Sequence, residues 1–413
     1  MTSIMRRRIG AQSRHSHISA AWITFMKFYA CFAVFTCFSN TYIITFLKRA
    51  TGSDTQTMLY NLSQLAVQPF AMIAAVYLIR KKSPLYSQRI GLIMYAAVFA
   101  AFCAFGEAVS HYHLLVGSVI SAANGFYFVT YVLQVWSYAT DQNRDESYGL
   151  QSLLSGVIGL TLPILSGYLV AGFDTFLGYR ILFGVGLLAS ALSVYFSTKL
   201  DPVGNVTPQA HVGQALRVLL TERHARAAML SATVTGFYSG AITFFVTLLL
   251  YSAAGSERTV GLTNTLANII TIVASGVYMR LVRPENRTRA IVLGLSALIL
   301  AAAPLLARVS VGTLMLFSLA QAALSCFIFN SALTAYFGVI ERIPALDGLG
   351  GEVHALREFF LKVGQITGTL ITIVFADVQG GAAVVIILIL LTQYLNVYFC
   401  RVMAEIPARP EKG

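Results

Sequence analysis

Neutral polar side chains recur at helical spacing inside long apolar stretches of this chain. Asn61, Gln64 and Gln68 follow one another at i, i+3 and i+7, so they share one face of a helix. Polar groups are costly inside a bilayer and usually face protein or water-filled space. Such stripes can bind a substrate or form interhelical hydrogen bonds, and both readings stay open here. The residues that we place in a candidate binding cavity are Asn40, Asn61, Gln64, Asn124, Tyr127, Tyr131, Tyr238, Asn264, Asn268 and Gln321.

The stripes are unevenly distributed over the apolar spans. They fall in spans one, two, four, seven, eight, ten and eleven, whereas spans three, six and nine have nothing comparable across their middles. We therefore expect a central polar cavity, with spans three, six, nine and twelve as an outer support. Neutral amides and tyrosine rings suit an uncharged or amphipathic ligand. No Asp or Glu lies mid-span in spans one, two, four, seven, eight or ten, so the expected cavity has no carboxylate as a proton carrier.

Glu107 and His111 are the best candidates for handling protons. Glu107 is the carboxylate placed most clearly inside a span, and His111 follows at i+4 on the same helical face. A carboxyl group in apolar surroundings holds its proton more tightly, and a nearby histidine can share that proton. The alternative is structural, because both residues lie near the outer end of span three, where Arg180 could hold Glu107 in an ion pair.

A short basic turn occurs twice, at residues 77–89 and 278–289. In each copy a tyrosine ends an apolar run, basic residues follow, and a proline precedes an arginine by five residues. The two prolines, Pro84 and Pro284, are 200 residues apart, about half the chain. The repeat predicts two similar halves, although any two cytoplasmic loops of a membrane protein can look basic.

We expect these turns to form an inner gate with carboxylates of the turns between spans four and five and between spans ten and eleven. Exposed ion pairs contribute only about 0–1 kcal/mol each, so they could tilt a conformational equilibrium without locking it. The alternative is that the basic residues are a topology signal alone. The gate residues are Lys27, Arg80, Arg89, Glu146, Arg280, Arg289 and Glu358, with Lys81, Lys82, Arg283, Arg287, Asp141, Asp145 and Glu352 as further candidates.

Lys27 is the basic residue that we place within a span. It lies about six residues into span one, roughly 9 Å along the helix. Its amine could snorkel to the inner interface, or it could pair with a gate carboxylate, Glu146 or Glu358.

Composition indicates a membrane protein. The chain has 413 residues, 57% of them hydrophobic and 11% charged, and its mean hydropathy is +0.71. A soluble domain carries about 25% charged residues, so lipid must cover much of this apolar surface. The formal net charge of +12 does not indicate nucleic-acid binding, because the basic residues lie in short turns between spans.

Twelve segments are long and apolar enough to cross about 30 Å of hydrocarbon. We therefore predict an all-α polytopic membrane protein with two six-helix pseudo-repeats. The expected spans are 21–47, 56–79, 89–110, 114–137, 148–172, 176–198, 225–251, 258–281, 289–307, 311–338, 355–376 and 381–403.

The distribution of Lys and Arg sets the orientation. With both termini inside, the inner segments hold 23 of the 29 basic residues and the outer turns hold five, with Lys27 in a span. The positive-inside rule then places both termini in the cytoplasm. The expected localisation is the bacterial cytoplasmic (inner) membrane, with multiple passes.

The two halves meet in a polar segment. Its second part is amphipathic, and we expect either a helix on the inner membrane face or a flexible linker. The expected parts are a cytoplasmic tail (1–19), a six-helix bundle (20–198), a cytoplasmic linker with an amphipathic helix (199–224), a second bundle (225–403) and a second tail (404–413).

Motifs for catalysis are absent from the sequence. There is no HExxH, no Cys-x-x-Cys, no P-loop and no nucleophile elbow, and the five cysteines all fall within expected spans. We expect neither enzyme activity nor a cofactor. His15 and His17 could bind a metal, but a solvated tail explains them more simply, so no metal site is assigned.

The sequence resembles the major facilitator superfamily over its whole length: twelve spans, two halves, a long middle loop, and basic turns after spans two and eight. The family's turn motif has glycines, an aspartate and basic residues. The turn after span two keeps Arg80, Lys81, Lys82 and Arg89 and lacks the glycines and the aspartate. The resemblance implies alternating access, with two halves rocking around a midplane site.

Two shorter resemblances bear on direction and substrate. Span five, with Gly156, Gly159, Pro163 and Gly167, is similar to the glycine-proline motif of the family's antiporters, with Leu162 where a glycine precedes the proline. The stretches SNTYIITFLKR and LREFFLKVGQ resemble a bacterial branch of exporters and glycolipid flippases. Both resemblances imply efflux.

Three function classes follow from these observations. The first is a secondary active transporter, an exporter by resemblance, for a small uncharged or amphipathic molecule. The second is a lipid or glycolipid flippase on the same fold, and the third is a non-transporting receptor or assembly factor. The expected partners are a small-molecule substrate, protons as a candidate coupling ion, and the lipid bilayer. We expect a monomer and no nucleic acid.

Overall fold

The structure, a computed structural model, describes residues 20–138, 144–173, 176–202, 211–254, 257–282, 286–375 and 381–407. All regular secondary structure in these ranges is helical, as expected. The expected N-terminal tail and the gate candidates Asp141 and Arg283 lie outside the described residues.

The first half of the chain follows the first six expected spans. The third of them ends in a short 3-10 helix before the chain turns back. The elements are α2 (Ala20–Thr51), α3 (Asp54–Lys81), α4 (Pro84–Phe105), η1 (Gly106–Tyr112), α5 (His113–Tyr138), α6 (Arg144–Ala171) and α7 (Leu177–Ser197).

The second half follows the last six expected spans after a short linker helix, α8 (Val212–Thr221). Span nine is interrupted before Pro304 and span twelve at Gln393, so each is built from two helices. The elements are α9 (Arg223–Ala254), α10 (Glu257–Leu281), α11 (Arg287–Ala302), α12 (Pro304–Ala307), α13 (Val311–Ile340), η3 (Pro344–Leu346), α14 (Gly350–Phe375), α15 (Gly381–Thr392) and α16 (Tyr394–Ala404).

Several described helices meet the length and composition needed to cross a membrane. One of them, Pro84–Val135, holds two of the expected spans. The seven stretches that meet the requirement in the described residues are Ala20–Thr51, Leu59–Lys81, Pro84–Val135, Leu177–Ser197, Arg287–Ala307, Val311–Ile340 and Ala383–Ala404.

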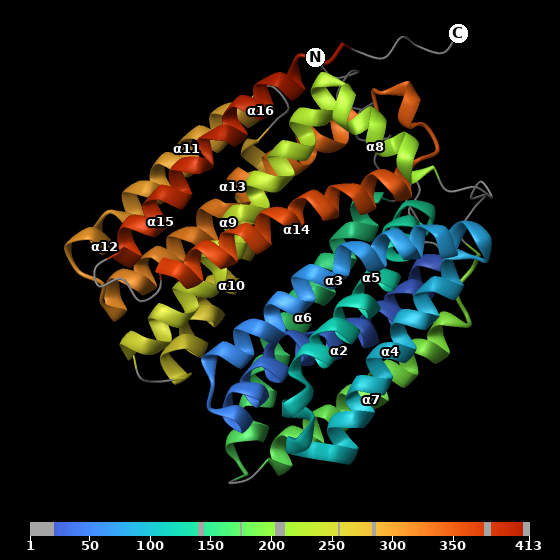
Figure 1. Cartoon of the computed structure of the whole chain (residues 1–413), viewed down its shortest axis with the longest axis vertical. Coiled ribbons are helices and arrows are strands. Elements are labelled where there is room, and N and C mark those ends of the chain that lie inside the picture. The colour runs from blue at the N-terminus through green and yellow to red at the C-terminus, as the bar shows by residue number, and fades with distance from the viewer. Residues whose placement is uncertain are drawn as a thin grey trace, which may run out of the picture.

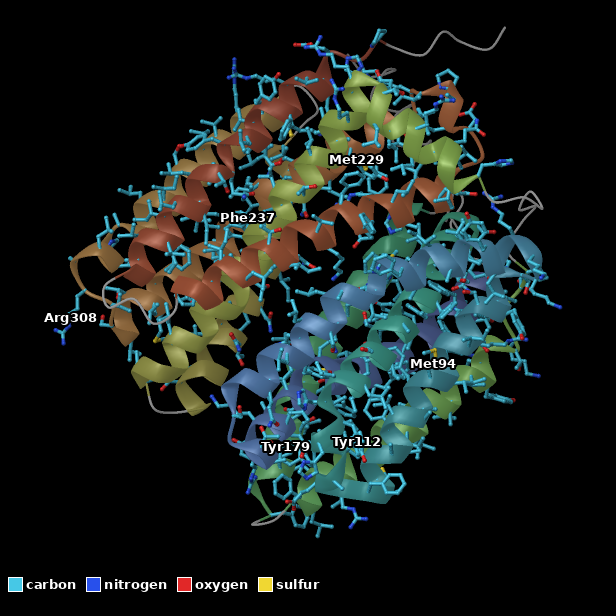
Figure 2. All side chains as sticks on the ribbon, viewed as in Figure 1. Met94, Tyr112, Tyr179, Met229, Phe237 and Arg308 are labelled. Atoms are coloured by element: carbon cyan, nitrogen blue, oxygen red, sulfur yellow. The ribbon has the colours of Figure 1, made fainter. Side chains whose placement is uncertain are left out.

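The helices gather into two bundles that lie side by side (Figure 1). One bundle contains α2 to α7 and the other contains α9 to α16, with α8 at one end of the second. We call this end the α8 end and the opposite end the α12 end. Arg308 and Tyr112, which lie in turns toward the α12 end, are labelled in Figure 2, where Arg308 points away from its bundle.

Local sequence explains the tight turn between α3 and α4. The Ser83 hydroxyl accepts a hydrogen bond from the backbone N–H of Tyr86 at 3.2 Å, as an N-cap does. Pro84 occupies the first position of α4, where a missing N–H costs nothing. The basic residues before this turn are therefore held close to the start of α4.

Each half has its own apolar core, and a small third cluster joins the halves. This joining cluster contains Met72, Ala75, Val76 and Ile79 of α3, Val129 of α5 and Ala355 of α14. Its α3 residues lie in the last three turns before the basic turn. The halves are therefore packed together toward the α8 end.

The linker helix α8 forms where the amphipathic pattern predicts a helix. Ala215 and Leu219 are fully buried in the core of the second half, while Leu220 is 44% exposed. Protein therefore covers part of the apolar face that we expected to lie on the membrane. The burial of Leu219 also argues against a freely flexible linker in this part of the segment.

Candidate functional site

A cavity of about 440 Å³ lies where the two halves face each other. This volume is within the range of small-molecule sites. Among the described residues its lining includes no acidic or basic side chain. The lining residues are Tyr131 of α5, Gln151, Ser155, Gly156, Gly159 and Leu160 of α6, and Asn268, Thr271 and Ile272 of α10.

Hydrogen bonds between α2, α5 and α6 hold the polar wall of this cavity. The Gln151 side-chain amide donates to the hydroxyl of Tyr131. The hydroxyls of Ser155 and Tyr29 lie 2.9 Å apart, which ties α6 to α2. The Tyr29 and Tyr131 rings are stacked with their centroids 6.0 Å apart. The wall is therefore an aromatic surface with amide and hydroxyl groups along one edge.

Small residues in α6 create the space for the cavity. A Cβ atom on Gly156 would lie 3.7 Å from Cδ1 of Ile272, across the gap between the halves, and Gly159 has open space beside it. Pro163 lacks an N–H and cannot donate to the carbonyl of Gly159, one turn earlier. The Gly159 carbonyl at the cavity wall therefore lacks its usual i+4 donor.

The expected cavity residues are spread over several environments, and two of them, Tyr131 and Asn268, line the cavity. Tyr127 is instead part of the aromatic core, because its ring stacks on Phe32 at 3.6 Å with an interplanar angle of 10°. Asn40, Asn264 and Asn268 are exposed; Asn61, Gln64, Asn124, Tyr131 and Gln321 are partly exposed; Tyr127 and Tyr238 are fully buried.

Some of the polar stripes serve helix packing. On α9, Ser239 accepts a hydrogen bond from the Gln365 amide at 3.1 Å, and Thr235 accepts one from the Asn396 amide at 3.2 Å. In the first half, the backbone carbonyl of Gln64 on α3 accepts a hydrogen bond from the Ser121 hydroxyl of α5, while the Gln64 amide donates to the Tyr60 hydroxyl within α3 at 2.7 Å. Polar stripes thus divide between interhelical hydrogen bonding and the cavity, the two readings left open by the sequence.

Arg80 and Glu352 form a buried ion pair across the two halves at the α8 end. The Nη2 atom of Arg80 lies 2.7 Å from Oε2 of Glu352, and the two side chains are 7% and 0% exposed. Nε of Arg80 also donates to Oε1 of Glu352 at 3.1 Å, and Nη2 donates to the Gly348 carbonyl at 3.0 Å. Two-point contacts of this kind fix geometry as well as adding energy.

The other expected gate residues have different partners. Arg89 donates from Nη2 to the carbonyl of Ser197 at 3.1 Å, so it ties α4 to the end of α7 within the first half. Glu358 accepts from its neighbour Arg357 at 2.7 Å. Arg280, Arg289 and Lys27 are exposed. The side chain of Glu146 lies outside the described residues.

Lys27 has the surroundings expected of a snorkelling side chain. It is exposed on α2. Among the described residues no carboxylate lies within ion-pairing distance of its amine, so the proposed pair with Glu358 is not formed in this structure.

The arrangement expected for Glu107 and His111 is not formed. Both belong to the 3-10 helix η1, in which residues three apart share a face, so the α-helical i+4 spacing does not bring them together. Both are exposed. Arg180 donates to the carbonyl of Cys103 at 2.9 Å, so the alternative ion pair with Glu107 is also absent from the described contacts.

Sequence reasoning missed two sets of residues. Gln151 and Ser155 lie four residues apart on one face of α6, with Gly159 of the glycine-proline motif at the next step of four, a spacing that could have marked them as a stripe. Lys362 was counted with the inner basic residues, although it lies well inside α14 and is partly buried. Its distance from the start of span eleven would have shown this.

Comparison with known proteins gives relatives without an established activity. No family model matches the chain. The uncharacterized protein YqgE of Bacillus subtilis (strain 168) is 24% identical over 339 residues, which cover 80% of this chain and 77% of YqgE.

Similar solved structures are membrane transporters. Two crystal structures of FucP, described as the fucose:proton symporter of E. coli and as a major facilitator superfamily transporter in the outward conformation, have TM-scores of 0.71. They are 14% and 13% identical and cover 94% of this chain and all of FucP. A bacterial homologue of the iron transporter ferroportin, in an outward-facing state, has a TM-score of 0.65 at 11% identity, covering 92% of this chain and 98% of that one.

These similarities extend over nearly the whole chain and include both halves. Together with the long apolar helices, they indicate a protein that crosses the membrane several times. The chain has the fold of the major facilitator superfamily transporters.

Proposed function

We propose that this protein is a secondary active transporter that moves a small uncharged or amphipathic molecule across the bacterial cytoplasmic membrane by alternating access, in the direction of export. It acts as a monomer and without a cofactor. The observation that carries the proposal is the cavity of about 440 Å³, whose walls come from α5 and α6 of one half and α10 of the other. A site shared by both halves is what alternating access requires, because each rocking motion exposes the same site to the opposite side.

The chemistry of the cavity supports the substrate class. Its polar groups are the neutral side chains of Tyr131, Gln151, Ser155, Asn268 and Thr271, beside aliphatic and aromatic surface. Such groups fix orientation by hydrogen bonding while the apolar surface supplies binding energy. A small dianion would find no countercharge among the described lining residues.

The Arg80–Glu352 pair supports a gate at the α8 end, which we assign to the cytoplasmic face because of the basic residues in the turns there. With this gate closed, we expect the cavity to open toward the other face; FucP and the ferroportin homologue are described in outward conformations. Protons stay the candidate coupling ion. The exposed positions of Glu107 and His111 do not support a role for these two residues as proton carriers.

The test is transport by purified protein reconstituted in liposomes with an imposed pH gradient, against a panel of fluorescent uncharged and amphipathic compounds. We expect gradient-dependent movement of at least one compound, and we expect Asn268→Leu to reduce it. If headgroup-labelled lipids cross instead, the protein is a flippase. If no solute or lipid moves, a receptor or assembly role replaces transport.

The chain offers a matched control for the cavity. Thr271 lines it and donates to the carbonyl of Ala267 at 2.9 Å, with the carbonyl of Ala322 of α13 also in reach at 3.3 Å, and Thr367 of α14 donates to the carbonyl of Val363 at 2.9 Å without lining it. Valine has the shape of threonine without its hydroxyl. The loss of one hydrogen bond between that hydroxyl and the substrate would cost about 1 kcal/mol of binding free energy. Thr271→Val should therefore raise the KM for transport about fivefold, and Thr367→Val should leave it unchanged.

A further inference from the structure

A charged cluster on α14 lies outside the lining of the cavity. It contains Arg357, Glu358 and Lys362, which follow Glu352 along the helix. Glu352 itself pairs with Arg80. Lys362 comes seven residues after the expected start of span eleven at residue 355, which is roughly 10 Å along a helix rising about 1.5 Å per residue. This places it about a third of the way across a hydrocarbon layer roughly 30 Å thick. An ionisable side chain at such a depth is costly and marks a functional position.

Helix contacts show which way Lys362 points. Gly364, two residues later and therefore on the opposite side of the helix, packs against the backbone of α9. Ala355, seven residues earlier and on the same face as Lys362, packs with α3 in the cluster that joins the halves. Phe359, three residues earlier, contacts the ring of Phe70 of α3 at 5.8 Å. Lys362 therefore faces the first half rather than the core of its own.

The charges in this cluster do not balance. Glu358 forms a 2.7 Å ion pair with Arg357, whose guanidinium also lies over the Tyr336 ring at 5.0 Å from its centroid. Glu352 is occupied by Arg80. Among the described residues no carboxylate lies within ion-pairing distance of Lys362. Glu358 is the carboxylate that acts electrostatically on Lys362, and its ion pair is with Arg357, so the cluster keeps a surplus positive charge, which is expensive to keep out of water.

Aromatic rings connect this cluster to the cavity wall. The His354 ring, one turn before Glu358, stacks on Phe128 of α5 at 5.5 Å with an interplanar angle of 20°. Phe128 in turn contacts the ring of Tyr131, which lines the cavity, at 5.7 Å. Both ring nitrogens of His354 are buried without a hydrogen-bond partner in the described part of the chain. The cationic cluster and the neutral cavity thus adjoin the same aromatic layer.

We propose that Lys362 binds an anionic group of the transported molecule, and that the neutral cavity binds the rest of that molecule. The proposal rests on the transport function proposed above and narrows its substrate class to amphipathic molecules with one carboxylate, sulfonate or phosphate group. An anion at Lys362 supplies the missing countercharge, whereas a neutral substrate would leave the cation uncompensated when the site closes. The head of such a molecule could belong to a free solute or to a membrane lipid.

The test measures binding and is therefore independent of transport. Purified protein in phosphatidylcholine nanodiscs is titrated with naphthalene-1-sulfonate and with the neutral naphthalene-1-sulfonamide, and dissociation constants are read from the concentration dependence of thermal unfolding. We expect the wild type to bind the sulfonate at least tenfold more tightly than the sulfonamide, since hydrogen bonds to a charged group are about twice as strong as neutral ones. Lys362→Gln should lose this preference and Lys362→Arg should keep most of it.

A control and a stability measurement separate binding from structure. Lys199→Gln removes an exposed lysine at the end of α7 and should retain the preference for the sulfonate. Lys362→Gln alone should unfold at the same temperature as the wild type or higher, because it removes an unpaired charge. A clearly lower unfolding temperature for Lys362→Gln would make Lys362 a structural partner of Glu358 and would overturn the proposal.

A second arm distinguishes the two sources of the anion. Nanodiscs that contain phosphatidylglycerol are compared by native mass spectrometry, and retention of this lipid by the wild type but not by Lys362→Gln would identify a lipid headgroup. Equal sulfonate affinity in the wild type and Lys362→Gln, with equal lipid retention, would overturn the assignment of Lys362. Transport of neutral compounds would then still support the proposed function, whereas binding without any transport would contradict that function alone.

Discussion

The two halves meet along two seams that use equivalent helices and are built in different ways. The α3–α14 seam has a buried ion pair, a joining apolar cluster and the Phe70–Phe359 ring contact. The α6–α10 seam has glycines and a cavity. At the shift of 200 residues that relates the basic turns, Arg80 corresponds to Arg280, which is exposed. The repeat therefore supplies equivalent helices, but one seam seals the α8 end while the other leaves room for a ligand.

This asymmetry shows how a nearly symmetric scaffold can hold one conformation. A fully buried Glu352 needs its partner, since an unpaired buried carboxylate costs several kcal/mol. The α6–α10 seam has no comparable constraint among the described residues, and its glycines permit either a gap or close packing. We infer that the ion pair determines which end of the protein is closed. The glycines of the α6–α10 seam then allow the helices there to move apart or together when the closed end changes.

The largest expected effect comes from breaking the sealed seam. Glu352→Gln leaves Arg80 without a countercharge in the closed α8 end, and removing one partner of a buried pair costs about 3–5 kcal/mol. We expect the closed state to lose most of its population, and transport to fall by at least tenfold. Cysteine accessibility at the α8 end, measured in the variant and the wild type, reports the population.

A charge exchange is the control for this prediction. In Arg80→Glu combined with Glu352→Arg the pair is reversed, and the closed state should recover in part. If Glu352→Gln leaves the accessibility of the α8 end unchanged, the ion pair does not hold the gate.

A smaller effect is expected within the second half, at the contact of α9 with α14. A Cβ on Gly364 would collide with the carbonyl of Thr233. Overpacking of this kind costs about 1–3 kcal/mol, so Gly364→Ala should lower the unfolding temperature. Gly276→Ala, with open space around the position, is the matched control. Equal unfolding temperatures for Gly364→Ala and Gly276→Ala would mean that the close contact of α14 with α9 does not contribute to stability.

The glycine seam can be altered without touching a charge. Gly156→Leu fills part of the cavity and meets Ile272, so we expect transport to fall about tenfold with little change in unfolding temperature, because the side chain enters open space. Gly184→Leu on α7 places the same side chain where nothing lies within 4 Å, away from the seam. Transport by the two variants would be compared in proteoliposomes, and equal rates would remove the cavity from the transport path.

The smallest effect is expected at Glu107. It is exposed on η1, which belongs to neither seam. Glu107→Gln should therefore leave pH-gradient-driven transport within about twofold of the wild type. A loss of gradient dependence in this variant, with unchanged expression, would return Glu107 and His111 to the role of proton carriers.

Much of the fold could be predicted because bilayer crossing imposes a simple rule on sequence. Long apolar runs had to be helices, and the described helices follow the twelve expected spans, down to the turn at Ser83 and Pro84. The interruptions at Pro304 and Gln393 and the 3-10 helix η1 were missed. Hydropathy averages over a window and does not record such local changes in helix geometry.

The site could be predicted less well, because a polar stripe shows that a helix face is not lipid-facing but does not show its partner. Ser239 and Thr235 proved to bond neighbouring helices, while Asn268 lines the cavity. The pairing of Arg80 with Glu352, which was among the further candidates, depends on which helices of the two halves adjoin. That information is tertiary and has no counterpart in local spacing.

The central claim is that the halves rock about a gate at the α8 end. It is tested most directly by two spin-label distances across the halves, in a chain whose five native cysteines are replaced. One pair, Lys82→Cys with Ala345→Cys, spans the α8 end, and the other, Tyr112→Cys with Arg308→Cys, spans the α12 end. All four positions are exposed. On adding Glu352→Gln, we predict that the first distance lengthens while the second shortens; two unchanged distances, or two that change in the same direction, would contradict the account.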